Sequence, residues 1–336
     1  MDRVLVTGIS GFLGGHVALQ LLNSGYFVRG SVRNLSKATK VRDTLARAGS
    51  DVSRLEVVEL DLLSDAGWDA AMKGVRYLQH TASPFSLETP KDPQDLIRPA
   101  VGGTERALNS ALAADVERIV LTSSTAAITY GHPQNRRRFS SDDWTQLEGG
   151  QVPAYQQSKA LAERRAWAIM DAAGRHGDLA VINPSGIFGP LLDEDPGTSA
   201  QLVSMLLGGR MPVLPRLGIN PIDVRDVAEA HLRAMTASEA GGRRHPMAVN
   251  GYYLADAARI LRQHYSSRRV PTALIPDWLV RLAAIAVPMM RPIVDELGEA
   301  KMVDTSAALS LLNRPFVTAD DAILATAESL IANGIV

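Results

Sequence analysis

The sequence of 336 residues contains no cysteine, and that absence excludes several kinds of chemistry. Without thiols the chain can form neither disulfides nor thiolate metal sites, and it has no cysteine nucleophile. A chain without disulfides fits a reducing compartment, so we expect a cytoplasmic protein. We also expect no bound metal.

The sequence also lacks an excess of charge and a long apolar run. Its 35 basic and 36 acidic residues leave a net charge of -1, so no overall field attracts nucleic acid or an anionic membrane. The most apolar late stretch, residues 279–290, contains Arg281 and Pro288 and is shorter than the roughly 20 residues that span a membrane. No leader peptide is expected, because an apolar strand begins near Val4. We therefore predict no nucleic-acid partner and no membrane partner.

A glycine-rich turn follows that first apolar strand, which covers residues 4–7. Its spacing is G-x-x-G-x-x-G, and a helix begins near Phe12. The first glycine permits a tight turn, the second lets the backbone approach a phosphate, and the third lets helix and strand pack closely. Backbone N–H groups at the start of the helix then bind an anion. The same pattern also occurs in turns without a ligand, but a second strand at residues 26–32 supplies the context of a dinucleotide-binding unit. The turn residues expected to bind a cofactor are Gly8, Ser10, Gly11, Phe12, Leu13 and Gly14.

Strands and helices alternate through residue 185, which predicts an α/β fold with a doubly wound parallel sheet, that is, a Rossmann domain. We predict a dinucleotide-binding domain over residues 1–185, to which 215–240 return, and a smaller C-terminal substrate lobe over 186–336. Two more strands are expected at 247–250 and 270–273. Ligand clefts usually lie between such parts.

The residues after the second strand indicate which nicotinamide cofactor binds. Folds that bind NAD place an acidic residue about 20 positions beyond the glycine turn, where it bonds the ribose 2′-hydroxyl. Arg33 stands there instead, with Lys40 further along. Because a guanidinium pairs with a 2′-phosphate, we predict NADP(H) in preference to NAD(H), with a solvated basic loop as the alternative. Asp61, at the end of the third predicted strand, could hold the adenine amino group or cap its own turn.

Tyr155 and Lys159 are four residues apart in a predicted helix, so their side chains share one face. A free tyrosine keeps its proton at pH 7, and a nearby ammonium lowers its pKa. Such a tyrosine can give a proton to a carbonyl oxygen as hydride arrives, while a hydroxyl from the cluster at 122–125 orients that oxygen. Each pattern alone has another explanation: Tyr155 and Lys159 could be neighbours on a solvent-exposed helix face, and the hydroxyls could cap their own turn. Their order along the chain favours the catalytic interpretation.

Further motifs accompany these two in register over the first two thirds of the chain. They are Thr7-Gly8-Ile9-Ser10-Gly11-Phe12-Leu13-Gly14, Val32-Arg33-Asn34, Leu60-Asp61-Leu62, His80-Thr81-Ala82-Ser83-Pro84, Pro99-Ala100-Val101-Gly102-Gly103-Thr104, Thr122-Ser123-Ser124, Tyr155-Gln156-Gln157-Ser158-Lys159, Asn183-Pro184 and Ile222-Asp223-Val224-Arg225-Asp226-Val227-Ala228. Together they resemble the extended short-chain dehydrogenases/reductases. Within that family the similarity is to the branch of dihydroflavonol reductases, cinnamoyl-CoA reductases and bacterial aldehyde or ketone reductases.

The resemblance implies specific roles for residues at the matching positions. The catalytic set would be Ser124, Tyr155 and Lys159, although Thr125 also carries a hydroxyl where relatives often have alanine. The residues implied to bind the cofactor beyond the glycine turn are Arg33, Lys40, Asp61, Leu62, Thr81, Ala82, Ser83, Thr122, Tyr155, Lys159, Pro184 and Ile187. The substrate would be a small carbonyl compound or its alcohol, and relatives occur as monomers and as homodimers.

Three functions remain to be distinguished. The first is an NADPH-dependent reductase of aldehydes or ketones that also runs in reverse. The second is a nucleotide-sugar epimerase or dehydratase on the same scaffold, for which tightly held NAD would be needed. The third is an NADP(H) sensor without activity, a role in which the Tyr155 and Lys159 pair is typically lost. A run of three arginines, Arg136 to Arg138, is assigned no function.

Overall fold

The computed structural model describes residues 2–336 except 85–89, 91, 134, 149–151, 196, 287–293, 295 and 299. At its centre lies a sheet of seven strands in the order β10-β7-β5-β4-β1-β2-β3, and every neighbouring pair is parallel. The strands are β1 (Arg3–Thr7), β2 (Phe27–Val32), β3 (Leu55–Glu59), β4 (Tyr77–His80), β5 (Arg118–Thr122), β7 (Leu179–Pro184) and β10 (Arg243–Met247). This arrangement confirms the doubly wound parallel sheet.

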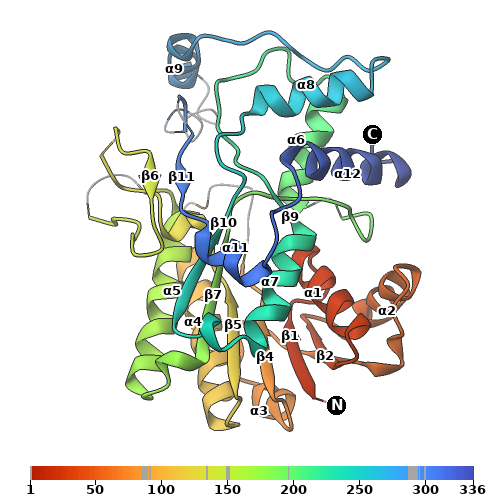
Figure 1. The fold of residues 1–336 in the computed structure, drawn as a ribbon, viewed down its shortest axis with the longest axis vertical. Coiled ribbons are helices and arrows are strands. Elements are labelled where there is room, and N and C mark those ends of the chain that lie inside the picture. Colours follow the sequence, from red (N-terminus) through yellow and green to blue (C-terminus); the bar gives the residue numbers. More distant parts are fainter. Residues whose placement is uncertain are drawn as a thin grey trace.

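Helices cover both faces of the sheet, and each face has its own apolar core (Figure 1). One face packs against α1 (Phe12–Asn23), α2 (Ala38–Arg47), α7 (Val224–Thr236) and α11 (Ser306–Leu312). The other packs against α3 (Trp68–Met72), α4 (Gln94–Ala113) and α5 (Ala154–Ala172). Central strands such as β7 are buried along their whole length, as expected when helices cover both sides of a parallel sheet.

A second group of helices lies above the end of the sheet toward which the strands run (Figure 1). It contains α6 (Gly197–Leu207), α8 (Leu254–His264), α9 (Asp277–Ala286) and α12 (Ala319–Ala332), and a third apolar core joins α6, α8 and α12. Two short pairs of strands connect the parts: β8 (Ile187–Phe188) with β9 (Ile222–Asp223), and β6 (Arg138–Phe139) with β11 (Met302–Val303). Beyond residue 240, β10 is an edge strand of the sheet and α11 packs on one of its faces. The domain boundaries predicted from the sequence stay predictions.

Two strands expected from the sequence are not where we placed them. The strand expected at 247–250 lies earlier, as β10, and ends at Met247. The stretch at 270–273 forms no regular strand, and only an isolated bridge joins Leu214 to Leu274. Pro271 lacks an N–H donor and so offers one hydrogen bond fewer to a ladder. Within the described residues, none of the helices combines the length and apolarity needed to cross a membrane.

Candidate active site

The glycine turn lies between β1 and α1, at the point in the sheet where β1 and β4 lie side by side and the strand order reverses. Gly8 has a φ of +72°, and a Cβ there would lie 3.0 Å from that of Ala82. A Cβ on Gly14 would lie 2.3 Å from the carbonyl oxygen of Gly8. Gly11 is the N-cap residue before α1 and has no side chain that could cap the helix. The first N–H groups of α1 therefore face the open end of the turn. These features fit a phosphate cradle.

The carboxyl ends of β1 and β4 are joined by side-chain hydrogen bonds beside this turn. The Thr7 hydroxyl accepts from the backbone N–H of Ala82 at 3.0 Å, and its oxygen lies 2.9 Å from Nδ1 of His80. The Thr81 hydroxyl donates to the carbonyl of Thr7 at 2.5 Å. Ser83 follows and lines the main cleft. The implied cofactor-binding residues 81–83 are therefore held against the glycine turn.

The main cleft lies at the carboxyl edge of the sheet and has a volume of about 530 Å³. Ser124 after β5 borders it, together with Tyr155 and Lys159 on the first turns of α5. Ile219 and Lys301, from segments outside the seven-stranded sheet, complete this border. That volume suits a small molecule. The other site residues predicted from the sequence that line it are Phe12, Leu13, Thr81, Ser83, Thr122, Pro184 and Ile187.

Tyr155 and Ser124 are hydrogen-bonded partners in this cleft. Burial raises the pKa of Tyr155, while the hydrogen bond to Ser124 opposes that shift. The prediction that Lys159 lowers the pKa of the phenol is therefore not met in this structure. The Lys159 ammonium lies 5.8 Å from the centroid of the Tyr155 ring, and burial is the largest cause of the raised pKa. Tyr155 is held in its protonated form.

Lys159 is buried, and burial lowers its pKa to about 8, although the carboxylate of Glu163 opposes this change. His80 lies nearby at the end of β4. Its own burial, together with the positive charge of Lys159, lowers the pKa of His80 to about 3. His80 is therefore neutral at physiological pH, so it places no second cation beside Lys159.

The sequence comparison agrees with this geometry. The family model described as "NAD dependent epimerase/dehydratase family" matches residues 4–250, which is most of the chain. The chain belongs to this family.

Within the family, the most similar proteins include named reductases. A cinnamoyl-CoA reductase of Medicago truncatula is 34% identical over 82% of this chain and 84% of its own length. The NADPH-dependent methylglyoxal reductase GRE2 of Saccharomyces cerevisiae is 33% identical over 78% of this chain and 82% of its own. The crystal structure of yeast methylglyoxal/isovaleraldehyde reductase Gre2 complexed with NADPH superposes with a TM-score of 0.80 at 27% identity, covering 99% of this chain and 100% of that one. The resemblance to the extended short-chain dehydrogenases/reductases and their dihydroflavonol reductase-like branch is confirmed.

In this family member, Arg33 and Lys40 lie at the outer side of the glycine turn. Arg33 is exposed directly after β2. Lys40 borders a smaller cavity of about 100 Å³, which Ser10, Gly11 and Phe12 also line. The Lys40 ammonium lies 3.3 Å from a carboxylate oxygen of Asp193, which follows β8. Asp193, which lies outside the seven-stranded sheet, thus contacts one of the two cations expected to hold a 2′-phosphate.

Three predicted cofactor residues have well-defined structural partners as well. Oδ1 of Asp61 accepts from the backbone N–H of Leu63 at 2.9 Å, so this side chain caps its own turn with one oxygen. Leu62 packs closely against Gly103 of α4, where an added Cβ would approach within 2.9 Å. The Thr122 hydroxyl lies 2.9 Å from Nε2 of His231 on α7. Thr122 therefore borders the cleft while its hydroxyl has a partner on a neighbouring helix.

Behind the cleft, a buried carboxylate connects four elements of the fold, and we missed it in the sequence. Glu163 lies one turn beyond Lys159 on α5 and is 1% exposed. It accepts from the Ser123 hydroxyl at 2.5 Å, from Asn183 Nδ2 at 2.8 Å and from Arg244 Nε at 2.5 Å. Because the hydroxyl of Ser123 is committed to Glu163, the strand end presents Ser124 to Tyr155. In the sequence, the one signal that could have indicated Glu163 was its position four residues after Lys159, on the same face of the predicted helix.

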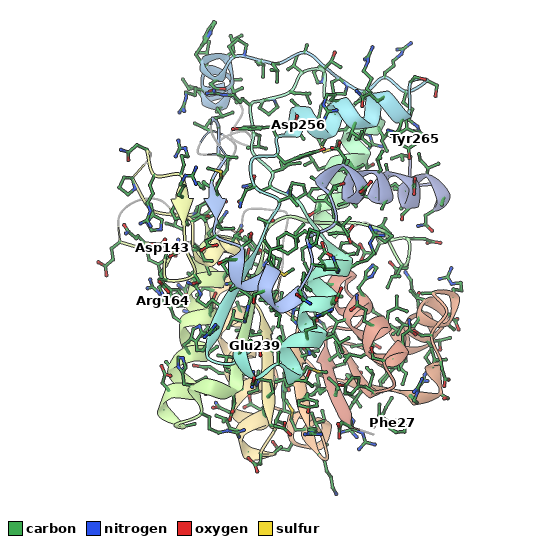
Figure 2. All side chains as sticks on the ribbon, in the orientation of Figure 1. Phe27, Asp143, Arg164, Glu239, Asp256 and Tyr265 are labelled. Carbon is green, nitrogen blue, oxygen red and sulfur yellow. The ribbon has the colours of Figure 1, made fainter. Side chains whose placement is uncertain are left out.

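Arg244 holds this carboxylate from the edge strand β10. Its guanidinium also donates to the carbonyl oxygens of Ser141 and Asp143, at 2.7 and 2.5 Å. It lies over the ring of Trp144, 4.0 Å from the centroid. Figure 2 labels Asp143 of this loop above Arg164, which lies in the second half of α5 and donates to the carbonyl oxygen of Thr145 at 3.2 Å. The loop before α5 is thus tied to the ion pair beneath the catalytic candidates.

Proposed function

We propose that the protein reduces an aldehyde or ketone to the alcohol with NADPH, and that it also catalyses the reverse reaction. The observation that carries this proposal is the meeting of a protonated Tyr155, its partner Ser124 and the buried Lys159 in one cleft beside the glycine turn. Reductases among the relatives, including one named as NADPH-dependent, support the same reaction.

The glycine turn and the strand ends would hold the cofactor. Gly8, Gly11 and Gly14 leave room for the pyrophosphate, whose charge the N–H groups at the start of α1 would bind. Arg33 and Lys40 would bind the 2′-phosphate that distinguishes NADPH from NADH. Lys159 would bond the nicotinamide ribose, and Pro184 and Ile187 would border the ring. When bound, NADPH supplies the hydride that the carbonyl carbon accepts.

Tyr155 would supply the proton. In the reduction, its hydroxyl donates to the carbonyl oxygen as the C=O double bond becomes a single bond, and the product is a neutral alcohol. The phenolate left behind is stabilised by the Ser124 hydroxyl and the Lys159 ammonium, and it regains a proton from solvent. Burial raises the pKa of Tyr155, so the phenol carries the proton that the reduction needs at neutral pH.

Ser124 would orient the substrate. Its hydroxyl is held by the backbone N–H of Ala126 at 3.1 Å and lies 3.3 Å from the carbonyl oxygen of Pro184. A fixed donor at this place can hydrogen-bond the carbonyl oxygen where negative charge develops. The commitment of Ser123 to Glu163 supports Ser124 over its neighbour in this role.

The epimerase or dehydratase alternative is not favoured, because the most similar curated proteins include reductases and Arg33 stands where NAD-binding folds have a carboxylate. A cytoplasmic location, a monomeric or dimeric state and the absence of a nucleic-acid partner stay predictions from the sequence.

The direct test is to incubate the protein with NADPH and a panel of aldehydes and ketones, and to measure NADPH consumption and alcohol formation together. We expect one alcohol formed for each NADPH consumed, with NADH used poorly. Tight binding of NADPH without turnover of any carbonyl compound would contradict the proposal.

A further inference from the structure

One end of the main cleft carries two cations that the proposed chemistry does not use. Arg137 and Lys301 both line this cleft, although they are far apart in the sequence. Each immediately precedes one strand of the β6–β11 pair, which lies beside the top of α5 in Figure 1. The pair is parallel, with Met302 opposite Arg138, and the backbone N–H of Met302 donates to the carbonyl of Arg137 at 2.7 Å.

This register explains why the two side chains share a direction. In a parallel pair, residues in register extend to the same face of the ribbon. With Met302 opposite Arg138, Lys301 stands opposite Arg137, and both therefore reach the cleft. The three consecutive arginines therefore differ in position, and Arg137 is the one that lines the cleft. Arg136 binds Asp143 at 2.6 Å, Arg138 is exposed, and neither is among the residues that border the cleft.

The charges at this end are not balanced. Lys301 lies 3.2 Å from a carboxylate oxygen of Glu296, which is the only acidic residue among the described residues of the cleft lining. Arg137 makes no ion pair with a described carboxylate, and its buried Nε has no hydrogen-bond partner. Among the residues that the structure describes, Arg137 and Lys301 therefore share one carboxylate, which leaves an excess of one positive charge where they meet.

An aromatic ring and an amide connect this cationic end to the proton donor. Lys301 lies over the ring of Tyr130, with its ammonium 3.8 Å from the centroid. The hydroxyl of Tyr130 hydrogen-bonds both Glu296 and the side chain of Gln156. Tyr155 lines the same cleft and is near enough to Tyr130 to contribute to the raised pKa of that phenol, so a short substrate can extend from Tyr155 toward the two cations.

We propose that Arg137 and Lys301 form a subsite for a carboxylate on the substrate, so that the preferred substrates are short oxo acids. The inference rests on the proposed reductase function. A planar guanidinium matches the geometry of a carboxylate, and a single negative charge matches the excess of one positive charge. A doubly charged phosphate would bring one more negative charge than this excess can neutralise.

The test compares three aldehydes of similar length in the presence of NADPH: succinate semialdehyde, its methyl ester, and butanal. We expect kcat/KM for the acid to exceed that for the ester by roughly 10- to 100-fold, the effect of a charge-assisted hydrogen bond. Arg137→Gln should remove most of this advantage, and Lys301→Gln should reduce it. Because both residues line the cleft, the quantity compared is the ratio of kcat/KM for the acid to that for butanal, which should fall in both variants. Arg138→Gln is the matched control, and it should keep the advantage.

The outcomes separate this inference from the proposed function. If the ester and butanal are reduced but the acid has no advantage, or if Arg137→Gln and Arg138→Gln behave alike, the subsite is wrong and the reductase function stands. If no aldehyde is reduced, the reductase function fails. Calorimetric binding of butyrate and butyramide then decides the subsite. Binding of butyrate that is lost in Arg137→Gln supports it, and equal binding of the two compounds overturns it.

Discussion

The protonation of Lys159 is controlled by two opposing contributions. Burial lowers its pKa to about 8, and the negative charge of Glu163 raises it. An uncharged lysine can stabilise neither the phenolate of Tyr155 nor a ribose hydroxyl as a cation would. The role proposed for Lys159 therefore requires a charge that this side chain loses only slightly above physiological pH.

We predict that kcat/KM for NADPH in the reduction falls as pH rises through about 8, because this parameter reports ionisations of the free enzyme. The sign follows from the acid: the active form is the protonated lysine, which exists below its pKa. Initial rates measured across the pH range test this. In Lys159→Arg, whose guanidinium stays charged, the overall rate should drop but the decline near pH 8 should vanish. Persistence of that decline would assign it to another group.

At the scale of a single element, α5 carries both the proposed catalytic residues and the buried carboxylate that supports them. Tyr155, Lys159 and Glu163 follow one another at successive turns of the helix. The first two face the cleft, while Glu163 binds side chains from the end of β5, from β7 and from β10. The helix is thereby fixed relative to the strand ends that carry Ser124. Glu163 is a positioning residue, since it acts through Lys159 and the strand ends.

Glu163→Gln should change both stability and the pH profile. It leaves Arg244 buried without its counter-charge, and breaking a buried pair costs about 3–5 kcal/mol in the free energy of unfolding. It also removes the charge that raises the pKa of Lys159, so the decline in kcat/KM should move to lower pH. Denaturant unfolding and the pH profile of the reduction provide the two measurements.

Glu105→Gln is the matched control for this variant. Glu105 also binds an arginine next to α5, at 2.5 Å from Arg165, but both side chains are substantially exposed. Such a surface pair contributes about 0–1 kcal/mol. The control should therefore leave stability and the pH profile nearly unchanged. If the pH profile of Glu163→Gln is unaltered, Glu163 has a purely structural role.

The sequence allowed prediction of the parts of the site that depend on local patterns. The glycine turn, the strand ends and the Tyr155–Lys159 spacing each lie within a short segment, so the fold class and the meeting of a hydroxyl of the 122–125 cluster with Tyr155 could be predicted from them. The choice of Ser124 within that cluster came from the family resemblance. The partnership of Glu163 and Arg244 joins residues 81 positions apart, and no local signal announces it. The assignment of Arg137 to the cleft likewise depends on pairing with a strand near the C-terminus.

At the scale of the whole molecule, the sheet and the part above it meet around the main cleft and the smaller cavity beside Lys40. The ion pair of Lys40 and Asp193 is one such contact, because Lys40 belongs to α2 and Asp193 follows β8. If Lys40 binds the 2′-phosphate, Asp193 competes with the cofactor for it. Occupancy of the 2′-phosphate site is then linked to the segment that leads into α6.

We predict that Arg33→Ser weakens the binding of NADPH by roughly 10- to 100-fold, the value of a charge-assisted contact, and leaves NADH almost unaffected. Asp193→Asn should tighten NADPH binding by about two- to fivefold, since an exposed ion pair is weak. Dissociation constants for both cofactors, measured by fluorescence titration, test these expectations. Equal effects on NADPH and NADH would show that neither residue senses the 2′-phosphate.

Replacement of Tyr155 by phenylalanine tests the central claim most directly, because it removes one oxygen from the cleft. With NADPH and an aldehyde that the unaltered protein reduces, we predict that Tyr155→Phe lowers kcat by roughly 100- to 10,000-fold, the usual contribution of a positioned proton donor. The dissociation constant for NADPH should change little, because the lost hydroxyl acts in the transition state. A Tyr155→Phe variant that binds NADPH and reduces the aldehyde at the full rate would contradict the account.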